Sequence, residues 1–453
     1  MDLRARDTIA AVATATGPGA VAIVRASGPA VRTLRDMVFV PRQAGAWSHA
    51  RLRLGEVRDP VDGTLLDEGL AAWFEAGRSY TGEELLELQV HGGTLNARRV
   101  LEAVLSTGAR LAEPGEFSFR ALRSGRLDLS QAEAVQQLVA ADSETARTLA
   151  LRALRGSAAQ TLAPLRELGV EVLAAIEASL DFGDDEVTLD SARLQQQLAA
   201  LLEALAELRA THHGAQALLE RPRVVLTGPP NAGKSTLLNA LARSDRAIVH
   251  ATPGTTRDVL EHGCTVDGQA LILVDTAGVR EAVDDIEAEA LVRARRAVES
   301  ADLCLIVIDA SLSASDDTLR AMDAARPGDL VVLNKSDRGF QTVWAALGEY
   351  GCRVSALTGE GLELLRARIA QRTRAPAELL ARDWVVTTQR HALLLDEAAQ
   401  WVERSRQELA QAQAPELVAE SLRRGLRALE HIVGGDLGED TLRAIFERFC
   451  IGK

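Results

Sequence analysis

The order of apolar and polar positions divides this chain into four stretches. Up to about Leu122, short β-branched runs such as Ala20–Val24 alternate with helical patterns and with Gly and Pro residues, which predicts a compact α/β or α+β domain. From about Ser130 to Gly214, apolar residues recur every three or four positions, as in the leucines at 194, 198, 201, 205 and 208. This spacing predicts long helices with one apolar face.

The second half of the chain changes pattern twice. Between about Arg221 and Arg374, short apolar strands alternate with helices, which is typical of a doubly wound parallel sheet. From Thr387 onward the helical pattern returns. Because a domain with neighbouring termini tolerates insertion, we expect one discontinuous helical domain with an inserted α/β domain, and two separate bundles remain the alternative. The predicted class is α/β and α, with domains at 1–122, 123–216, 217–376 and 377–453.

Composition narrows the class of protein. The 453 residues include 51 Lys+Arg and 64 Asp+Glu, and 47% are hydrophobic, which is ordinary for a globular chain and excludes a disordered or collagen-like one. A net charge of −13 argues against a general nucleic-acid coat protein. The sequence has no apolar run of membrane-spanning length and no signal-peptide pattern, so we expect a cytoplasmic protein without a membrane partner. Four scattered cysteines indicate reduced thiols.

A glycine-rich loop is the first motif that indicates chemistry. Gly228–Ser235 reads GPPNAGKS, follows an apolar strand and opens a helical run, the context that a phosphate-binding loop requires. Its amides and the helix N-terminus favour an anion, Lys234 reaches the β- and γ-phosphates, and Ser235 offers its hydroxyl to Mg²⁺. Lys234 is one of only three lysines in an arginine-rich chain. The loop predicts a nucleoside triphosphate site.

A second motif follows strand 271–274. Asp275-Thr-Ala-Gly278 resembles the magnesium-side element of such enzymes, in which the Asp reaches the ion through water and the Gly278 amide senses the γ-phosphate. Like the phosphate loop, it lies at the carboxyl end of a predicted strand, where an open parallel sheet binds its ligand.

The third motif indicates which base is bound. Asn334-Lys-Ser-Asp337 follows strand 330–333. Asp337 can accept hydrogen bonds from N1–H and the 2-amino group of guanine, which adenine lacks, so GTP is predicted over ATP. Asn334 would reach the N7 side of the base and the Lys335 stem would lie over its plane. Ser355-Ala356 would complete the pocket.

A switch segment lies between these motifs. Pro253-Gly-Thr-Thr-Arg-Asp258 is a candidate first switch, with Thr256 as a Mg²⁺ ligand. Val279 stands where Ras-like enzymes place a water-orienting Gln, and valine cannot orient water. A carboxylate of the acidic segment that follows would have to do so, and a solvated switch without a catalytic carboxylate is the alternative. The segment contains Glu281, Asp284, Asp285, Glu287 and Glu289.

The last four residues hold the remaining candidate. Cys450 lies near two cations, Arg448 and Lys453, and neighbouring cations lower the pKa of a thiol and make it reactive. An ordinary cysteine at a helix end is the alternative. The Cys-Ile-Gly-Lys sequence does not suit a prenylation signal, so we expect no lipid anchor.

The motifs together resemble one family over the whole chain. The terminal CIGK, the Asn-bearing phosphate loop and Gly254–Asp258 combine with three N-terminal motifs. By this combination the chain resembles the MnmE (TrmE) family of bacterial tRNA modification GTPases. The N-terminal motifs are Thr81-Gly-Glu-Glu, His91-Gly-Gly and Pro114-Gly-Glu-Phe117.

The resemblance implies an activity and partners. It implies an N-terminal folate-binding domain through which a homodimer forms, and a TrmE-type G domain inserted into the helical domain. The family works with the flavoprotein MnmG, in a heterotetramer whose FAD is on the partner. Together they add an aminomethyl or carboxymethylaminomethyl group at C5 of the wobble uridine of certain tRNAs. A tetrahydrofolate, 5-formyl or 5,10-methylene, carries the one-carbon unit, while GTP hydrolysis drives conformational cycling.

The resemblance also implies roles for single residues. Glu287 matches the family's water-orienting glutamate, and Cys450 is a second candidate catalytic residue. Asn231 matches the asparagine that binds K⁺, and the other K⁺ ligands would be His250, Thr252 and Thr255. Mg²⁺ would be held by Ser235 and Thr256. For folate, the matching residues are Arg25, Glu87 and Lys453, and Arg126 stands where the family commonly has Lys.

The predicted GTP contacts come from all of these motifs. They are Gly228, Asn231, Ala232, Gly233, Lys234, Ser235, Thr236, His250, Ala251, Thr252, Pro253, Gly254, Thr255, Thr256, Asp275, Thr276, Ala277, Gly278, Asn334, Lys335, Ser336, Asp337, Ser355, Ala356 and Leu357.

Two other functions would use a similar G domain. A ribosome-assembly GTPase would hydrolyse GTP as a timer, but the C-terminal segment has no Gly-x-x-Gly module of the KH type. The other alternative is a structural protein whose helical segments form a dimer and whose GTPase domain regulates it. The ribosome-assembly function gives Cys450 and Lys453 no task.

Overall fold

The computed structural model describes most of the chain in two compact units. It describes residues 7–15, 17–141, 143–182, 190–219, 221–242, 261–267, 269–275, 296–374, 377–447, 449 and 452. One unit comprises residues 1–140, 150–209 and 389–453, and the other comprises 141–149 and 210–388. The first unit is thus built from stretches on both sides of the second in the sequence.

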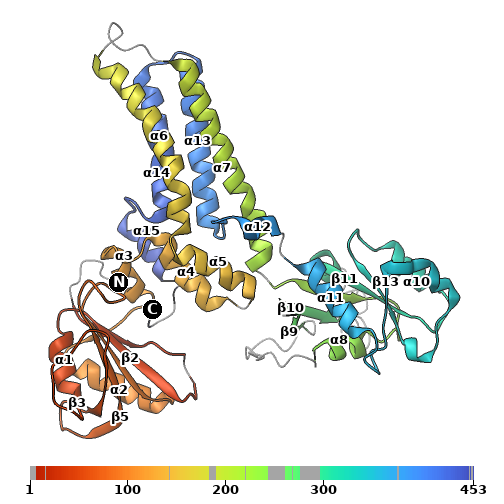
Figure 1. Cartoon of the computed structure of the whole chain (residues 1–453), viewed down its shortest axis with the longest axis horizontal. Coiled ribbons are helices and arrows are strands. Elements are labelled where there is room, and N and C mark those ends of the chain that lie inside the picture. Colours follow the sequence, from red (N-terminus) through yellow and green to blue (C-terminus); the bar gives the residue numbers. More distant parts are fainter. Residues whose placement is uncertain are drawn as a thin grey trace, which may run out of the picture. The chain divides into compact units, whose positions relative to one another are not determined.

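A seven-stranded sheet forms the N-terminal part of the first unit (Figure 1). The strand order is β3-β4-β5-β6-β2-β1-β7, antiparallel except for the parallel β1–β7 pair. The strands are β1 (Ile9–Val12), β2 (Val21–Ser27), β3 (Phe39–Pro41), β4 (Leu52–Arg58), β5 (Leu65–Phe74), β6 (Leu85–His91) and β7 (Arg110–Leu111). Of the two classes expected for this domain, α+β is therefore the one observed.

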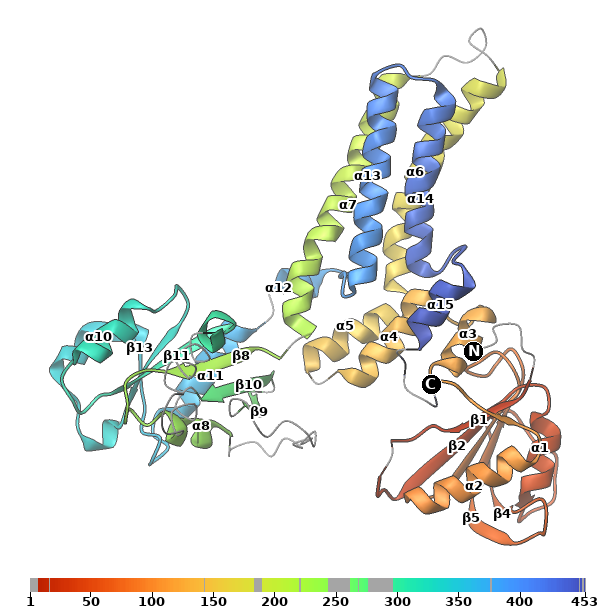
Figure 2. The same cartoon turned by 180° about the vertical axis from the view of Figure 1, so that it is seen from behind.

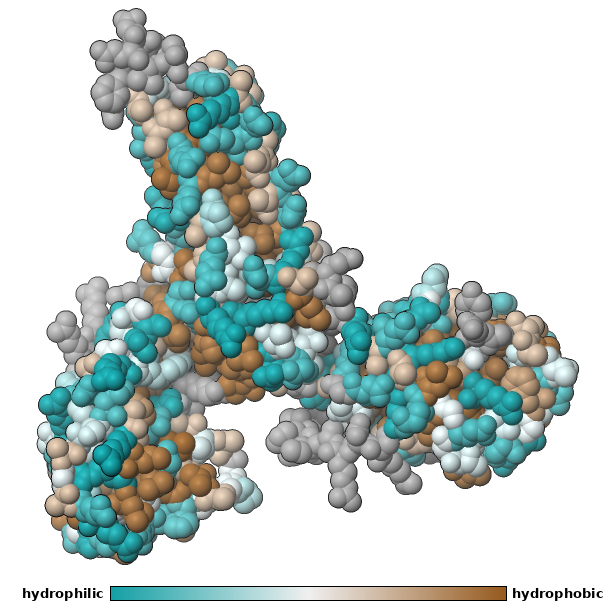
Figure 3. Space-filling view, viewed as in Figure 1, coloured by the Kyte–Doolittle hydropathy of each residue, from teal (hydrophilic) through white to brown (hydrophobic). Residues whose placement is uncertain are grey.

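Helices α1 (Val31–Val38) and α2 (Thr94–Ser106) cover one face of this sheet, and Figure 2 shows α2 in front of the strands. Because side chains alternate along a strand, Ala22, Val24 and Ala26 of β2 are buried in the core with these helices. Val21 and Arg25 take the opposite face. On that face Val21, Leu52 and Leu54 are exposed, and Figure 3 shows hydrophobic side chains gathered over the N-terminal domain. One face of the sheet is therefore partly uncovered.

The helical part of the first unit is one bundle of four long helices, α6, α7, α13 and α14, which lie side by side in both views (Figures 1 and 2). The first unit contains helices α3 (Glu116–Arg123), α4 (Leu129–Ala140), α6 (Ser157–Phe182), α13 (Gln389–Ala410), α14 (Pro415–Val433) and α15 (Glu439–Phe446). Helices α5 (Glu144–Leu154) and α7 (Ser191–Leu219) each cross the boundary between the two units.

Contacts between the two sequence halves hold the bundle together. Arg209 of α7 pairs with Asp396 of α13 at 2.8 Å, and Arg423 of α14 pairs with Glu177 of α6 at 2.7 Å. Helix α14 starts with Pro at its first turn and ends at Gly434 in the left-handed region, as helix-capping preferences predict. The discontinuous helical domain is confirmed, and the alternative of two separate bundles is wrong.

The C-terminal helix packs on the N-terminal part of the same unit. The Phe446 ring lies 5.6 Å from the Phe119 ring, edge to face, in a cluster with Leu129 and Phe449. A Cβ at Gly115 would lie 2.6 Å from the Phe446 carbonyl oxygen, so only glycine allows this approach. The C-terminus is thereby brought to the N-terminal sheet.

The second unit contains a six-stranded sheet in the order β13-β12-β11-β8-β10-β9, in which every pair is parallel except β9–β10. The strands are β8 (Arg223–Thr227), β9 (Glu261–Val266), β10 (Gln269–Asp275), β11 (Leu303–Asp309), β12 (Leu330–Asn334) and β13 (Gly351–Arg353). The helices are α8 (Lys234–Ala242), α10 (Asp316–Asp323), α11 (Leu362–Thr373) and α12 (Ala377–Ala381), with 3-10 helices η2 (Ser336–Arg338) and η3 (Thr342–Tyr350). The predicted inserted α/β domain is confirmed.

Among the helices within the described ranges, none combines the length and the apolar character that crossing a bilayer requires.

Candidate functional site

The phosphate loop joins β8 to α8 and has an unusual backbone. Gly228 and Gly233 have φ of +132° and +90°, and Asn231 has φ of +60°, a value that asparagine tolerates better than most residues. A Cβ at Gly228 would overlap the Val307 carbonyl oxygen of β11. Lys234 is buried and donates from Nζ to the carbonyl oxygens of Gly228 and Pro229, at 3.0 and 2.8 Å. The Lys234 ammonium thus lies inside the predicted phosphate-binding loop.

Two oxygen ligands meet beside this loop. Strands β8 and β10 are parallel neighbours with Leu226 opposite Asp275, so Asp275 comes next to the start of α8. Ser235 Oγ donates to Asp275 Oδ2 at 2.5 Å. A hydroxyl and a carboxylate at this place are the hard oxygen donors that Mg²⁺ prefers. Ser235 and Asp275 therefore fit the Mg²⁺ ion that the nucleotide-binding motifs imply.

The guanine motif is tied to the phosphate loop by its own side chains. Asn334 Nδ2 donates to the Ala232 carbonyl oxygen at 2.9 Å, and Asn334 Oδ1 accepts from the Ala356 amide at 3.0 Å. Ser355 Oγ donates to Asp337 Oδ1 at 2.6 Å, which orients the carboxylate whose lone pairs would accept from the base. The motifs after β8, β12 and β13 therefore form one site.

Lys335 has two partners, of which the sequence indicated neither. Its backbone is left-handed, with φ of +61°, and Nζ donates to the Asn231 carbonyl oxygen at 2.6 Å and to Asp309 Oδ2 at 2.8 Å. Burial alone would raise the pKa of Asp309, but hydrogen bonds from Lys335 and Ser311 lower it below its usual range. Asp309 is not among the residues predicted from the sequence, although its place at the end of β11 is a signal for it.

Several predicted residues lie outside the described part of the chain. They are His250 to Thr256, Thr276 to Gly278, Glu287, Cys450 and Lys453. Thr236, Ser336 and Leu357 are described, and Thr236 lies in the first turn of α8.

The N-terminal domain brings the predicted folate residues Arg25 and Glu87 together. They are direct partners in the β2–β6 register, and Arg25 Nη2 donates to Glu87 Oε1 at 2.8 Å. The guanidinium lies 5.5 Å from the Tyr80 ring centroid and 5.7 Å from that of Phe117, which suits cation–π attraction. Tyr80, which the sequence did not indicate, also donates or accepts a hydrogen bond with Ser118 at 2.8 Å.

The C-terminal segment reaches this pair. Arg25 Nη1 donates to the Gly452 carbonyl oxygen at 3.4 Å. Gly452 has φ of +90°, and a Cβ there would overlap the Val12 carbonyl oxygen and lie 2.9 Å from the Ala13 Cα. The chain therefore passes close to β1 at the residue between the predicted Cys450 and Lys453.

The fourth predicted folate residue, Arg126, follows α3. It is exposed, and its amide donates to the Ala121 carbonyl oxygen at 2.9 Å. A Cβ at Gly82 would lie 3.3 Å from Arg126 Cγ, so the Arg126 stem packs beside the loop that contains Tyr80. The loop 79–84 thus adjoins both Arg25 and Arg126.

Comparisons with known proteins match this architecture. The family model described as "GTP-binding protein TrmE N-terminus" matches residues 8–126, and the one described as "MnmE helical domain" matches residues 129–450. The protein named tRNA modification GTPase MnmE from Roseiflexus sp. (strain RS-1) is 40% identical over 99% of both chains. Proteins of the same name from Synechocystis sp. (strain ATCC 27184 / PCC 6803 / Kazusa) and Syntrophotalea carbinolica are 38% and 40% identical, over 100% and 99% of both chains.

The chain belongs to the MnmE family. It is therefore a GTP hydrolase of the tRNA modification GTPase class. Membership of a GTPase family implies GTP and Mg²⁺ as ligands. It also explains why the MnmE helical-domain match spans the inserted unit, since residues on both sides of that unit form one bundle.

Proposed function

We propose that this GTPase acts with the flavoprotein MnmG to add a carboxymethylaminomethyl or aminomethyl group to C5 of the wobble uridine of certain tRNAs. The one-carbon unit would come from 5-formyl- or 5,10-methylene-tetrahydrofolate. The observation that carries the proposal is the bond from Arg25 to the Gly452 carbonyl. It ties the segment containing Cys450 and Lys453 to the domain that holds the predicted folate residues.

The residues around Arg25 fit a folate. The ligand has carboxylates on its glutamate and hydrogen-bonding groups on its pterin, and it would supply a carbon at the oxidation level of formaldehyde or formate. Arg25 and Arg126 offer guanidinium donors to carboxylates, and Glu87 offers an acceptor. The side chains of Arg25 and Glu87 are mostly buried, at 20% and 17% exposure, so their charges are screened less than surface charges.

In the G domain each residue has a proposed task. Lys234 holds the β- and γ-phosphates, Ser235 and Thr256 hold Mg²⁺, and Asp337 selects guanine. Glu287 orients the attacking water in place of the Gln that Val279 replaces. Mg²⁺ and K⁺ would neutralise charge on the phosphates, with K⁺ bound by Asn231, His250, Thr252 and Thr255.

The proposed assembly is a homodimer that joins MnmG, with FAD on that partner, and acts on tRNA in the cytoplasm. The uncovered face of the N-terminal sheet supports the homodimer, because Val21 is 56% exposed and Leu52 49%. Contiguous apolar surface of this kind usually marks an interface.

Nucleoside analysis of tRNA tests the proposal. A strain lacking this protein should lose the modified wobble uridine, the wild-type chain should restore it, and Arg25→Gln should not, although its GTPase activity should stay near that of the wild type. Normal wobble uridines in the deletion strain would refute the proposal. That result would favour a ribosome-assembly switch, for which the Arg25–Gly452 contact has no use.

A further inference from the structure

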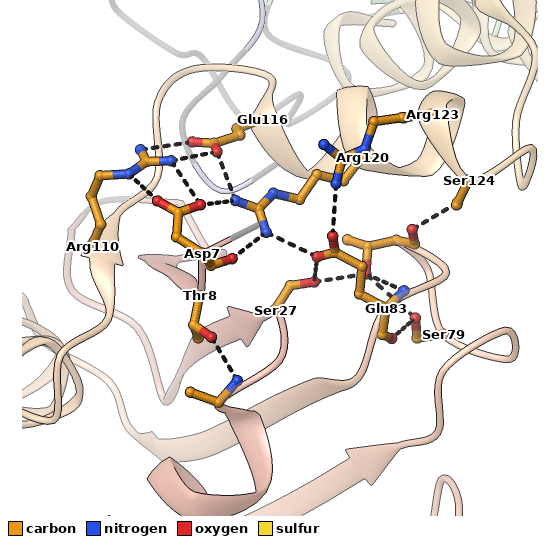
Figure 4. Close-up of polar contacts among 12 residues, drawn as sticks. Asp7, Thr8, Ser27, Ser79, Glu83, Arg110, Glu116, Arg120, Arg123 and Ser124 are labelled. Carbon is orange, nitrogen blue, oxygen red and sulfur yellow. Dashed lines mark hydrogen bonds and ion pairs between the residues drawn. The ribbon is translucent and has the colours of Figure 1, made fainter. Parts of the chain in front are cut away.

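Six charged side chains of the N-terminal domain and α3 form one cluster (Figure 4). They come from the segment before β1, the loop before β6, β7 and α3, and three are guanidinium groups and three are carboxylates. The cluster consists of Asp7, Glu83, Arg110, Glu116, Arg120 and Arg123. None of them is a predicted ligand contact.

Arg120 is the centre of this cluster. Its side chain is 3% exposed. Nη1 donates to the Asp7 carbonyl oxygen at 2.7 Å and to Glu83 Oε2 at 2.9 Å. Nη2 donates to Asp7 Oδ1 at 2.8 Å and to Glu116 Oε1 at 3.0 Å. One planar fork therefore fixes three separate parts of the chain, which a lysine ammonium cannot do with the same geometry.

Two carboxylates of the cluster, Glu116 and Asp7, are held in their charged form. Burial alone would raise the pKa of Glu116, but hydrogen bonds from Arg110, the Glu113 amide and Arg120 lower it below its usual range. A hydrogen bond from Arg110 is the main cause that lowers the pKa of Asp7. Asp7 and Glu116 thus stay charged at neutral pH, and Arg110 and Arg120 keep these two carboxylates as partners.

Through Glu83, Arg120 reaches the loop 79–84. Glu83 Oε2 also accepts from Ser27 Oγ at 3.0 Å, and Ser27 Oγ lies 2.7 Å from Thr81 Oγ1. Ser79 Oγ donates to the Glu83 carbonyl oxygen at 2.5 Å. Ser79, Thr81 and Glu83 bond one another, while Tyr80 between them contacts Arg25 and Ser118.

The loop 79–84 also contacts the side chain of Arg126. Ser124 Oγ donates to the Thr81 carbonyl oxygen at 2.7 Å, and Gly82 packs against the Arg126 stem. A shift of the loop would therefore move the Tyr80 ring under Arg25 and the surface beside Arg126 together.

We propose that Arg120 is a positioning residue for the folate site: by holding Glu83 it sets the loop 79–84, and the loop sets Arg25 and Arg126. The inference rests on the proposed folate-binding function. Arg120 itself touches neither ligand nor reacting atoms. Its effect belongs to ligand affinity and not to GTP hydrolysis, which is performed by the other unit.

A matched pair of substitutions tests this role. Arg120→Lys keeps the charge and loses the fork. Arg110→Lys makes the same change in the same cluster, but Arg110 bonds Asp7 and Glu116 and lies on the far side of Asp7 from Glu83 (Figure 4). We expect the Kd for 5-formyl-tetrahydrofolate to rise about tenfold or more in Arg120→Lys, because charged hydrogen bonds are lost, and to change less than about twofold in Arg110→Lys. Glu83→Gln should repeat the effect of Arg120→Lys in a less buried residue.

The outcomes separate the possible explanations. Full-length variants are compared by calorimetric folate titration, thermal unfolding and GTPase kcat, and kcat should stay unchanged in all of them. If both lysine variants lost affinity in proportion to their loss of Tm, Arg120 would be merely structural and the inference overturned. Unchanged folate affinity in Arg120→Lys and Glu83→Gln would overturn it as well. If the wild-type chain failed to bind the folate, the proposed function would itself be wrong, and the inference with it.

Discussion

Two residues of the nucleotide site hold a backbone conformation that side chains disfavour. Asn231 and Lys335 have φ of +60° and +61°, and such a conformation costs a residue with a Cβ on the order of 1 kcal/mol. They are bonded to each other, because Lys335 Nζ donates to the Asn231 carbonyl oxygen. The strain is concentrated between the predicted phosphate loop and the predicted guanine motif, and strain of this kind is common at functional sites. Three predictions concern single residues.

The first prediction concerns the K⁺ role of Asn231. Replacing K⁺ by Na⁺ at constant ionic strength should lower kcat of GTP hydrolysis. The reason is that K⁺, the larger cation, fits the proposed site, where its charge takes the place of an arginine finger. In Asn231→Ala the two salts should give similar, low rates, whereas Asn239→Ala, an exposed residue of α8, should keep the difference. Equal rates of GTP hydrolysis by the wild type in K⁺ and in Na⁺ would rule out the proposed role of K⁺.

The second prediction concerns base selection. Asp337→Asn should weaken GTP binding by about tenfold or more and favour xanthosine triphosphate, because an amide donor replaces a carboxylate that accepted from the base. Nucleotide titrations of both triphosphates measure the change. Asp323→Asn, on the exposed side of α10, is the control. An unaltered GTP Kd in Asp337→Asn would contradict the assignment.

The third prediction concerns Gly452. Gly452→Ala should weaken folate binding and abolish wobble-uridine modification, because the added Cβ overlaps the Val12 carbonyl oxygen and the backbone is left-handed. GTP hydrolysis should be unchanged. Gly438→Ala, where a Cβ meets open space, is the matched control. Equal folate affinity in Gly452→Ala and Gly438→Ala would show that the C-terminal segment is not part of the folate site.

Among the elements, α4, α13 and α14 are joined by one buried ion cluster. Arg390, in the first turn of α13, pairs with Glu133 of α4 at 2.7 Å and donates to the last carbonyls of α14, at His431 and Ile432. The neighbouring His391 lies 2.9 Å from Glu133. The chain resumes the first unit at Gln389, so the cluster fixes the point at which the chain returns to the bundle.

Stability of this junction should depend on pH in one direction. Burial lowers the pKa of His391, and hydrogen bonds from Arg390 and His391 outweigh burial and lower the pKa of Glu133 to about 2. Both groups bind protons more readily when unfolded, so stability is present at neutral pH and falls with acidification. His391 destabilises the fold as the pH falls below about 6.5, where the unfolded imidazole binds a proton that the buried one does not. Glu133 contributes roughly 3 kcal/mol of stability, which is lost between about pH 4.5 and pH 2.

Urea unfolding at a series of pH values, followed by circular dichroism, measures this dependence. Glu133→Gln should be less stable than wild type at pH 7 and should lose less stability on acidification. Glu203→Gln, an exposed change on α7, should follow the wild-type curve. A wild-type free energy of unfolding that does not fall between pH 7 and pH 2 would show that the cluster does not govern stability.

At the scale of the molecule, the N-terminal sheet is covered by helices on one face only. Leu54 and Leu52 of β4 and Val21 of β2 are exposed on the other. Burying such residues stabilises an association by about 25 cal/mol per Å² of apolar area. A second copy of the chain, brought to this face, would explain why apolar residues stand there.

Leu54→Glu should therefore convert a homodimer into a monomer, because a carboxylate would be desolvated in the interface. Light scattering after size exclusion measures the mass. Leu319→Glu, equally exposed but on α10 of the other unit, should stay dimeric. A dimeric Leu54→Glu would place the interface elsewhere.

The sequence by itself determined the motifs of the candidate nucleotide site, since their residues stand in short runs between a strand and a helix or loop. Gly228–Ser235, Asp275 and Asn334–Asp337 could be assigned because local geometry orients consecutive residues and parallel strands align their carboxyl ends. Arg25 and Glu87 came only from resemblance to a family, because nothing local joins residues 62 positions apart. Tertiary structure alone decided the Arg25–Gly452 bond and the partners of Arg120, and it confirmed the single helical domain that the sequence favours over two separate bundles. Each of these features depends on strand register or on the packing of helices. Both result from many weak contacts between distant segments, so no single position in the sequence indicates them.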